Sequence, residues 1–144
     1  SCNFNCEYCY EQNKNYGHVS NFDLKNNIDK IFHKVNNESL QEKLTIEFLG
    51  GEPFLNINGL EFACKYIAEK FNIKVNLMLT TNGSIYNSKL VSLLNQYNIR
   101  IFLSIDGNKF MHNACRLTYK KESTYDLVIE NAKKYLLELN VKPV

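Results

Sequence analysis

Hydrophobic residues recur along this chain with two periods, and each period predicts a different kind of element. In four segments the apolar positions lie three and four residues apart, which is the spacing of one buried helix face. The first and last of these segments open with capping boxes, at residues 20–23 and 123–126, and the third is expected over 87–97. The apolar positions of the four predicted helices are Leu24, Ile28, Ile31, Phe32 and Val35; Leu60, Ala63, Cys64, Ile67 and Phe71; Leu90, Val91, Leu93 and Leu94; and Leu127, Ile129, Ala132, Leu136 and Leu139.

Short apolar runs without a helical period lie between these segments, as is typical of buried strands. They cover residues 44–49, 74–81 and 100–105, and a further strand is expected to begin near Val141. The polar stretch 36–43 is expected to be a loop. Strands that alternate with helices form a parallel sheet with right-handed crossovers. The pattern therefore predicts an α/β fold, and both an open doubly wound sheet and a barrel or partial barrel satisfy it.

Turn residues follow each predicted strand, namely Gly-Gly-Glu-Pro at 50–53, Asn-Gly at 82–83 and Asp-Gly at 106–107. A helical segment follows each of them, so they are predicted to be strand-to-helix loops at the carboxyl edge of the sheet, where α/β proteins bind their ligands. Side chains alternate along a strand, which places Ile101, Leu103 and Ile105 on the face toward the helices.

Four polar side chains occupy the last positions of the opposite face. They are Thr80, Asn82, Ser104 and Asp106, and we expect them to converge on a cavity near the N-terminal cysteines. The alternative for Asn82 and Asp106 is a purely local role, because both residue types bond to their own backbone in turns.

Three cysteines stand in a C-x3-C-x2-C array at Cys2, Cys6 and Cys9. A short loop with this spacing turns three thiolates toward one centre, which favours a metal site over cysteines that merely pack. A disulfide fits poorly, because the number in the array is odd and the other two cysteines are distant. Two kinds of site remain open. One is a zinc site closed by His18, and the other is a cubane iron-sulfur cluster with one iron open to an outside ligand.

Composition narrows the class of protein further. The 144 residues are 44% hydrophobic with a net charge of +2, values typical of one globular domain or part of one. So small a charge, with lysines scattered along the helices, argues against nucleic acid as a partner. No apolar run approaches the roughly 20 residues that span a bilayer, so we expect no membrane partner and a cytoplasmic location. The chain opens one residue before its first cysteine and closes at the start of an expected strand, so we expect a fragment.

Together, the array of Cys2, Cys6, Tyr8 and Cys9 and the Gly-Gly-Glu-Pro sequence after the next strand resemble the radical S-adenosylmethionine (radical SAM) enzymes. Three further segments look like the subgroup that modifies peptides and proteins, which includes the anaerobic sulfatase-maturating enzymes and the thioether-forming peptide maturases with an auxiliary cluster domain. These segments are Thr81-Asn82-Gly83, Ser104-Ile105-Asp106-Gly107 and His112-x3-Arg116. The resemblance implies a partial (β/α)6 barrel of the TIM type over residues 1–144, truncated at both ends and with about four parallel strands.

The resemblance also implies cofactors. In the family, three such cysteines hold a 4Fe-4S cluster whose open iron chelates the amino and carboxylate groups of S-adenosylmethionine. The reduced cluster cleaves the cofactor to methionine and a 5'-deoxyadenosyl radical, which abstracts hydrogen from the substrate. By position, the resemblance places Cys2, Cys6 and Cys9 on the cluster. It places Gly50, Gly51 and Glu52 at the methionine amino group, with Pro53 fixing the exit from the turn. It also places Ser104 and Asp106 near the ribose, Arg116 at the carboxylate and Asn82 in the same site.

The implied function is an enzyme that abstracts hydrogen from a peptide or protein, with a flavodoxin or ferredoxin as electron donor. A small-molecule substrate for the same chemistry is one alternative, and a zinc-stabilised binding module using the three cysteines and His18 is another. Cys64 is expected in the core, Cys115 is expected to be an ordinary thiol, and His18 and His112 are expected to have surface or packing roles. The sequence departs from the family before the last helix, where 120–123 replace its usual glycines.

Overall fold

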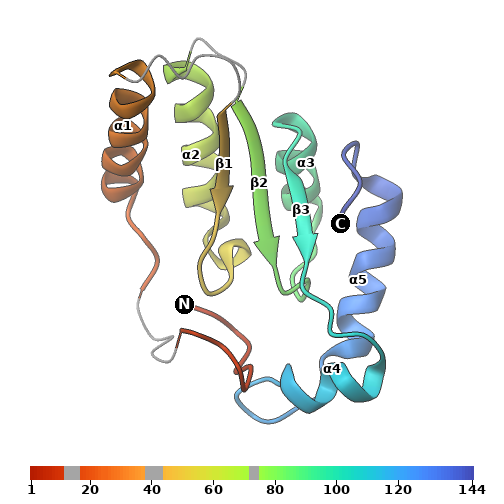
Figure 1. Ribbon diagram of the computed structural model, residues 1–144. Coiled ribbons are helices and arrows are strands. Elements are labelled where there is room, and N and C mark those ends of the chain that lie inside the picture. Colours follow the sequence, from red (N-terminus) through yellow and green to blue (C-terminus); the bar gives the residue numbers. More distant parts are fainter. Residues whose placement is uncertain (12–16, 38–43, 72–74) are drawn as a thin grey trace.

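A three-stranded parallel sheet in the order β1-β2-β3 forms the centre of the molecule (Figure 1). The structure is a computed structural model and describes residues 1–11, 17–37, 44–71 and 75–144. All four predicted helices and three of the four predicted strands are present. The elements are α1 (Asn21–Asn37), β1 (Leu44–Phe48), η1 (Pro53–Asn56), α2 (Ile57–Lys70), β2 (Val75–Thr81), α3 (Ser88–Gln96), β3 (Arg100–Leu103), α4 (Lys109–Cys115) and α5 (Tyr125–Glu138).

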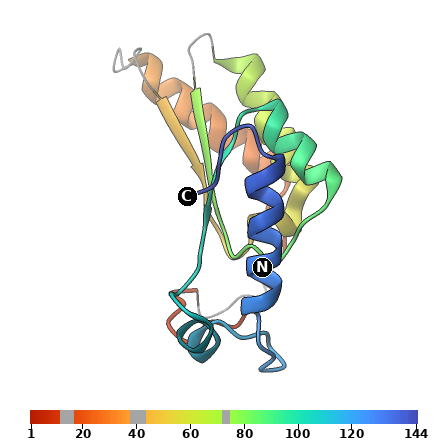
Figure 2. The same cartoon turned by 90° about the vertical axis from the view of Figure 1, so that its right-hand side faces the viewer.

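The sheet is covered by helices on one face, and Figure 2 shows α2, α3 and α5 together on that side. Along β2, Leu77, Leu79 and Thr81 are buried beneath these helices, whereas Met78 and Thr80 alternate with them on the less buried face. The predicted parity of the strand is therefore confirmed. Cys64 of α2 is fully buried in the same core, as expected.

The start of α1 confirms the first capping box. The hydroxyl oxygen of Ser20 accepts the backbone N–H of Asp23 at 3.1 Å, and the hydroxyl donates to the Asp23 carboxylate at 2.6 Å. A side-chain acceptor at this position satisfies one of the N–H groups that the first turn leaves without a helical partner. The helix continues through Asn36 and Asn37, where a loop was predicted, and residues 38–43 of that loop lie outside the described part.

The second capping box is wrong. Helix α5 begins at Tyr125 with Thr124 as its N-cap residue, and the Thr124 side chain makes no capping bond. The side chain of Asn113 accepts the N–H groups of Thr124 and Tyr125 instead, each at 3.1 Å. The Thr124 hydroxyl instead donates to the carbonyl of Arg116, which draws it away from the first turn of the helix. The hydroxyl is thus used to fix the preceding loop.

The predicted buried face of α5 is also partly wrong. Leu127 and Leu136 are 48% and 50% exposed, and the residues buried in their place are Val128, Asn131 and Tyr135, with Ala132 and Leu139 buried as predicted. Two of these side chains carry polar atoms that meet backbone carbonyls beneath the helix. The Asn131 amide donates to Gly83 at 2.9 Å, and the Tyr135 hydroxyl donates to Ile85. Because apolar residues alone cannot reveal such bonds, the pattern misplaced the face.

The third strand ends at Leu103, two residues earlier than predicted, because its neighbour β2 ends at Thr81. One more ladder bond follows, from Ser104 N–H to the Thr81 carbonyl at 3.0 Å. The fourth strand predicted near Val141 is not formed as a strand among the described residues. Val144 alone lies beside β3, where its N–H donates to Ile101 and its carbonyl accepts from Leu103.

Two short helices were not predicted. The 3-10 helix η1 follows the Gly-Gly-Glu turn, and α4 occupies 109–115 between β3 and α5. Helix α4 is capped by Asn108, whose side chain accepts from Met111 N–H at 3.0 Å. None of the described helices is long and apolar enough to cross a membrane.

Candidate active site

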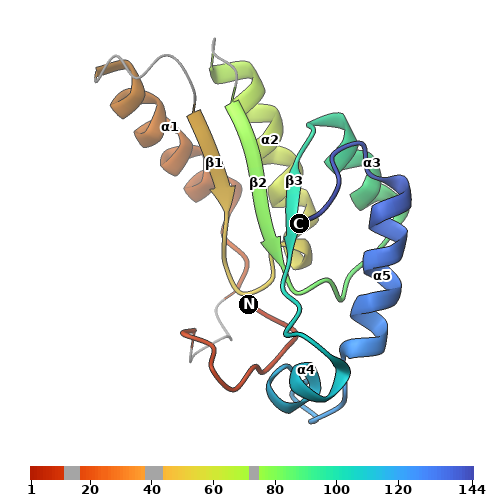
Figure 3. The same ribbon diagram turned by 45° about the vertical axis from the view of Figure 1, so that its right-hand side comes forward.

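The N-terminal cysteine loop crosses the carboxyl edge of the sheet (Figure 3). On one side Glu52 N–H donates to the carbonyl of Ser1 at 2.9 Å. On the other side Asn5 N–H donates to Leu117 at 2.8 Å and Glu7 N–H donates to Cys115 at 3.0 Å. The loop is therefore held between the turn after β1 and the segment after α4, which come from distant parts of the sequence.

One cavity of about 200 Å³ brings the three cysteines together with the ends of all three strands. The expected convergence of Thr80, Asn82 and Ser104 is confirmed, whereas Asp106 is not part of the lining. Arg116 reaches the cavity from the residue after α4. The lining consists of Cys2, Cys6, Tyr8, Cys9, Tyr10, Leu49, Gly50, Gly51, Thr80, Thr81, Asn82, Ser104 and Arg116.

The two glycines of the turn differ in what surrounds them. A Cβ on Gly51 would lie 2.2 Å from the carbonyl oxygen of Ser1 and 2.9 Å from the Cys2 Cβ, whereas a Cβ on Gly50 would meet no atom within 4 Å. Gly51 is therefore required for the close approach of the cysteine loop to the turn. Pro53 takes the first position of η1, where its fixed φ suits a helix start.

Glu52 is a buried carboxylate that joins the ends of β1 and β2. Its Oε1 accepts from Thr81 Oγ1 at 2.8 Å and from Phe54 N–H at 3.0 Å, and its Oε2 accepts from Asn82 N–H at 2.7 Å. Burial raises the pKa of Glu52, and these three hydrogen bonds oppose the shift. The side chain thus holds the turn in place, and the neighbouring Gly50 and Gly51 line the cavity.

Tyr8, Asp106 and Arg116 form a charged cluster at the mouth of the cavity. The Tyr8 hydroxyl donates to Asp106 Oδ2, and Arg116 Nε lies 3.0 Å from Asp106 Oδ1 as an ion pair without hydrogen-bond geometry. The guanidinium also lies over the Tyr8 ring, 5.3 Å from its centroid. Burial disfavours the charged form of Asp106, but Tyr8 and Arg116 outweigh it and hold the pKa of this carboxyl below its usual value.

His112 lies fully buried behind this cluster, so its expected packing role is confirmed. Its Nδ1 accepts the N–H of Asp106 at 3.3 Å, and its Nε2 lies 3.1 Å from Thr124 Oγ1. Because the Thr124 hydroxyl already donates to Arg116, Nε2 must carry the proton. Burial, followed by the nearby Arg116 charge, lowers the pKa of His112 and keeps the ring neutral.

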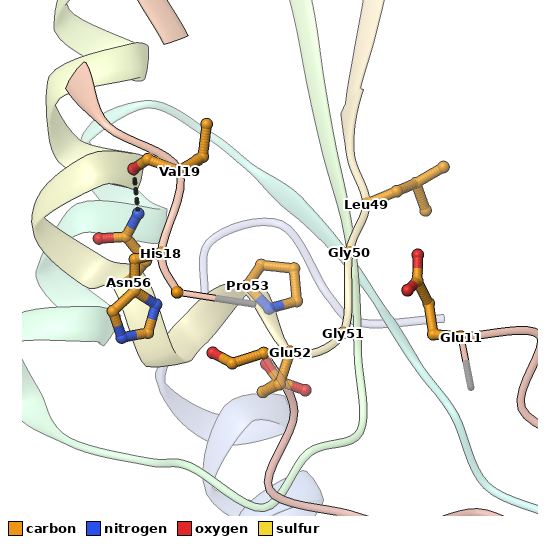
Figure 4. Close-up of a pocket in the computed structure, with 11 residues that line it drawn as sticks. Glu11, His18, Val19, Leu49, Gly50, Gly51, Glu52, Pro53 and Asn56 are labelled. Atoms are coloured by element: carbon orange, nitrogen blue, oxygen red, sulfur yellow. Dashed lines mark hydrogen bonds between the residues drawn. The ribbon is translucent and has the colours of Figure 1, made fainter. Parts of the chain in front are cut away.

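His18 lies apart from the cysteines. It lines a second cavity of about 260 Å³ on the outer side of the Gly-Gly turn, and the three cysteines are absent from that lining. Figure 4 shows His18 on the Asn56 side of the turn and Glu11 on the Leu49 side. Within the described ranges, no three His, Cys, Asp or Glu side chains are gathered to hold a single metal ion. The separate positions of His18 and the cysteines disfavour a zinc site that they would form together, because structural zinc is held by four protein ligands around one ion.

Sequence reasoning did not assign a role to Tyr8 beyond its place in the motif, and it missed Asn3 and Ser84 altogether. Asn3 and Ser84 hydrogen-bond to each other at 2.8 Å although 81 residues separate them. No local pattern signals such a contact. The sequence feature that came closest to predicting this contact was the expected position of Asn82 near the cysteine loop, at the carboxyl edge of the sheet.

Residues 1–128 match the model of the 4Fe-4S single cluster domain family, and the chain therefore belongs to that family. Two relatives show which enzymes the chain resembles. The chain is 27% identical over 124 residues to the radical SAM cyclopropyl synthase TigE of Paramaledivibacter caminithermalis, a match that covers 77% of this chain and 26% of that protein. It is 29% identical over 155 residues to a cysteine-type anaerobic sulfatase-maturating enzyme of Clostridium novyi, covering 100% of this chain and 41% of that protein. The resemblance to radical SAM enzymes is thereby confirmed.

The fold matches a solved structure described as native anSMEcpe with bound AdoMet and Kp18Cys peptide. The TM-score is 0.85 at 24% identity, over 99% of this chain and 39% of that chain. The arrangement of three parallel strands with flanking helices is therefore the fold of the matched part of that protein. In every one of these matches the chain spans less than half of the other protein.

Proposed function

We propose that this chain is the cluster-binding part of a radical SAM enzyme that modifies a peptide or protein. The observation that carries the proposal is the single cavity shared by three cysteine thiols, a glycine turn, polar strand ends and one arginine. Cys2, Cys6 and Cys9 would hold a 4Fe-4S cluster there, and the cluster with S-adenosylmethionine would supply one-electron cleavage of the cofactor and a radical able to take a hydrogen atom from the substrate.

The donor set fits a cubane cluster. Cys2, Cys6 and Cys9 offer three thiolates around one cavity, and such a cluster binds each thiolate through a different iron. The sulfur of Cys2 also lies 3.4 Å from the N–H of Phe4, which is an orientation suited to a metal-bound thiolate. We assign the three cysteines to the cluster.

The remaining residues of the cavity are assigned to S-adenosylmethionine. Gly50 and Gly51 expose backbone to the cavity without a side chain, and Glu52 and Pro53 fix that backbone, which suits capture of an amino group by carbonyl oxygens. Arg116 offers a planar fork of donors for a carboxylate, and its Nε is already oriented by Asp106. Ser104 and Asn82 line the same space. We place Ser104 on the ribose side, and Asp106, which lies outside the lining, beside it through its contacts with Tyr8 and Arg116.

A peptide or protein substrate is the choice that the relatives favour. Sulfatase-maturating enzymes act on a protein, and the matched solved structure is described with a bound peptide. An electron donor of the flavodoxin or ferredoxin class would supply the reducing electron. A small-molecule substrate would use the same cavity and is distinguished by the product assay below.

Cysteine substitution tests the cluster assignment. The full-length protein is reconstituted anaerobically with iron and sulfide, and bound iron is measured for Cys2→Ala, Cys6→Ala and Cys9→Ala. Each variant is expected to lose most of its iron, whereas Cys115→Ala, a matched change outside the array, keeps it. Iron retained by all three variants would refute the assignment.

Product analysis tests the reaction. The reduced protein is incubated with S-adenosylmethionine and a library of cysteine- and serine-containing peptides, and 5'-deoxyadenosine is measured by chromatography. Peptide-dependent formation of 5'-deoxyadenosine with a matching loss of hydrogen from the peptide is expected. Formation that rises with small metabolites and not with peptides would favour the small-molecule alternative.

A further inference from the structure

A closed ring of hydrogen bonds joins the cysteine loop to the end of β2. Asn82 Nδ2 donates to Asn3 Oδ1 at 2.9 Å, Asn3 Nδ2 donates to Ser84 Oγ at 2.8 Å, and Ser84 Oγ donates to Asn82 Oδ1 at 2.6 Å. Each of these three side chains donates once and accepts once within the ring. Asn3, Ser84 and Asn82, here called the Asn-Ser-Asn ring, thus connect residues about 80 positions apart.

One backbone group sets the direction of the whole ring. The N–H of Ser84 donates to Asn82 Oδ1 at 2.9 Å, and a backbone N–H is a donor only. The Asn82 oxygen must therefore face Ser84, and its amide nitrogen must face the cysteine loop. The opposite orientation of the Asn82 amide would place two donors against each other, so it is excluded on chemical grounds.

The fixed amide leaves one N–H beside a cluster ligand. Asn82 Nδ2 lies 3.8 Å from the sulfur of Cys2, within reach of an N–H to sulfur hydrogen bond. Asn82 is 6% exposed, so water competes little for this donor. With two bonds accepted at its oxygen and two donated from its nitrogen, the Asn82 amide is fully satisfied.

We propose that Asn82, oriented by the backbone N–H of Ser84 and by Asn3, places an N–H donor on the Cys2 sulfur and so raises the reduction potential of the cluster held there. Hydrogen bonds to cluster sulfurs stabilise the more negative, reduced state, which shifts the potential upward. Asn82 is thus a positioning residue that acts on the cluster through Cys2. The inference rests on the proposed function, because it requires a cluster on the three cysteines.

The test is a redox titration of the reconstituted full-length protein, followed by electron paramagnetic resonance (EPR) of the reduced cluster. Asn82→Ala removes the donor and is expected to lower the midpoint potential. Ser84→Ala is the matched control, because it removes the ring hydroxyl but keeps the backbone N–H that orients Asn82. Its midpoint is expected to equal that of the parent protein.

A second variant covers the case in which Asn82→Ala fails to load a cluster. Asn82→Asp has the same outline, replaces the donor with an oxygen and is expected to lower the midpoint further. A midpoint equal to the parent's in the loaded Asn82 variant, or an equal shift in Ser84→Ala, overturns the inference. Either result leaves the proposed function standing, provided that the parent protein loads a cluster that responds to S-adenosylmethionine. A parent that takes up no cluster overturns the proposed function and this inference with it.

Discussion

The carboxylate of Glu52 accepts the backbone N–H of Asn82 at 2.7 Å and thereby ties the turn after β1 to the end of β2. Both residues are almost fully buried. The bond fixes the two strand ends whose loops line the cavity, so the geometry of the site depends on a side chain that does not line it. This relationship gives the first prediction.

Glu52→Gln is expected to destabilise the protein by about 2 kcal/mol, because an amide nitrogen would replace one of the two oxygens that accept buried donors. Glu47→Gln is the matched control. Glu47 also accepts a threonine hydroxyl of β2, from Thr80 at 2.9 Å, but on the exposed face. Urea unfolding of both variants measures the difference, and an equal effect of the two substitutions would contradict the role given to Glu52.

The two glycines of the turn should respond differently to alanine. Gly51→Ala would place its Cβ 2.2 Å from the Ser1 carbonyl oxygen, so it is expected to displace the cysteine loop, to cost about 2 kcal/mol of stability and to reduce iron loading. Gly50→Ala meets no atom within 4 Å and is expected to fold and load iron like the parent. Unfolding curves and iron analysis of both variants check this. Normal iron loading by Gly51→Ala would show that the loop does not need the close approach.

Lys121 occupies a backbone conformation that favours glycine. Its φ is +60°, in a turn where its N–H donates to the Thr118 carbonyl at 2.9 Å. Lys121→Gly is expected to stabilise the protein by about 1 kcal/mol by removing strain in this left-handed position. The neighbouring Lys120 has no positive φ, so Lys120→Gly is expected to be neutral or destabilising. A thermal unfolding comparison of the two variants tests the difference, and equal effects would contradict it.

His112 should make stability fall as the pH drops below about 6.5. Its folded pKa lies below its unfolded value near 6.5, so the folded state binds the proton less readily than the unfolded state. This contribution is fully present above the unfolded pKa and is lost as pH falls through that value toward the folded pKa. His112→Gln is expected to flatten the dependence, as measured by urea unfolding at several pH values. An unchanged slope in the variant would show that His112 is not its source.

The hydrophobic pattern was sufficient for most of the fold because helices α1 to α3 and strands β1 to β3 bury continuous apolar faces. It failed where polar atoms decide the packing. Helix α5 is turned by the bonds of Asn131 and Tyr135 to carbonyls of the β2–α3 loop. The N–H groups at its start are accepted by Asn113 of α4, which lies outside the predicted capping box. Helix α4 has seven residues, too few for a periodic signal.

Part of the site could be predicted because some of its residues belong to short sequence motifs. Cys2, Cys6 and Cys9 and the glycine turn are local motifs, and parallel strands bring their carboxyl ends to one edge whatever the details. The prediction placed Asp106 in the cavity, whereas the structure pairs it with Arg116 and Tyr8 outside the lining. That contact joins residues up to 98 positions apart, and no spacing within the sequence encodes it.

The most direct test of the central claim is EPR of the anaerobically reconstituted, reduced full-length protein with and without S-adenosylmethionine. The account predicts a 4Fe-4S signal whose g values change when the cofactor is added, because one iron of a three-cysteine cluster is open to the cofactor's amino and carboxylate groups. A 4Fe-4S signal that ignores the cofactor, or a protein that binds one tight zinc and forms no cluster, would contradict it.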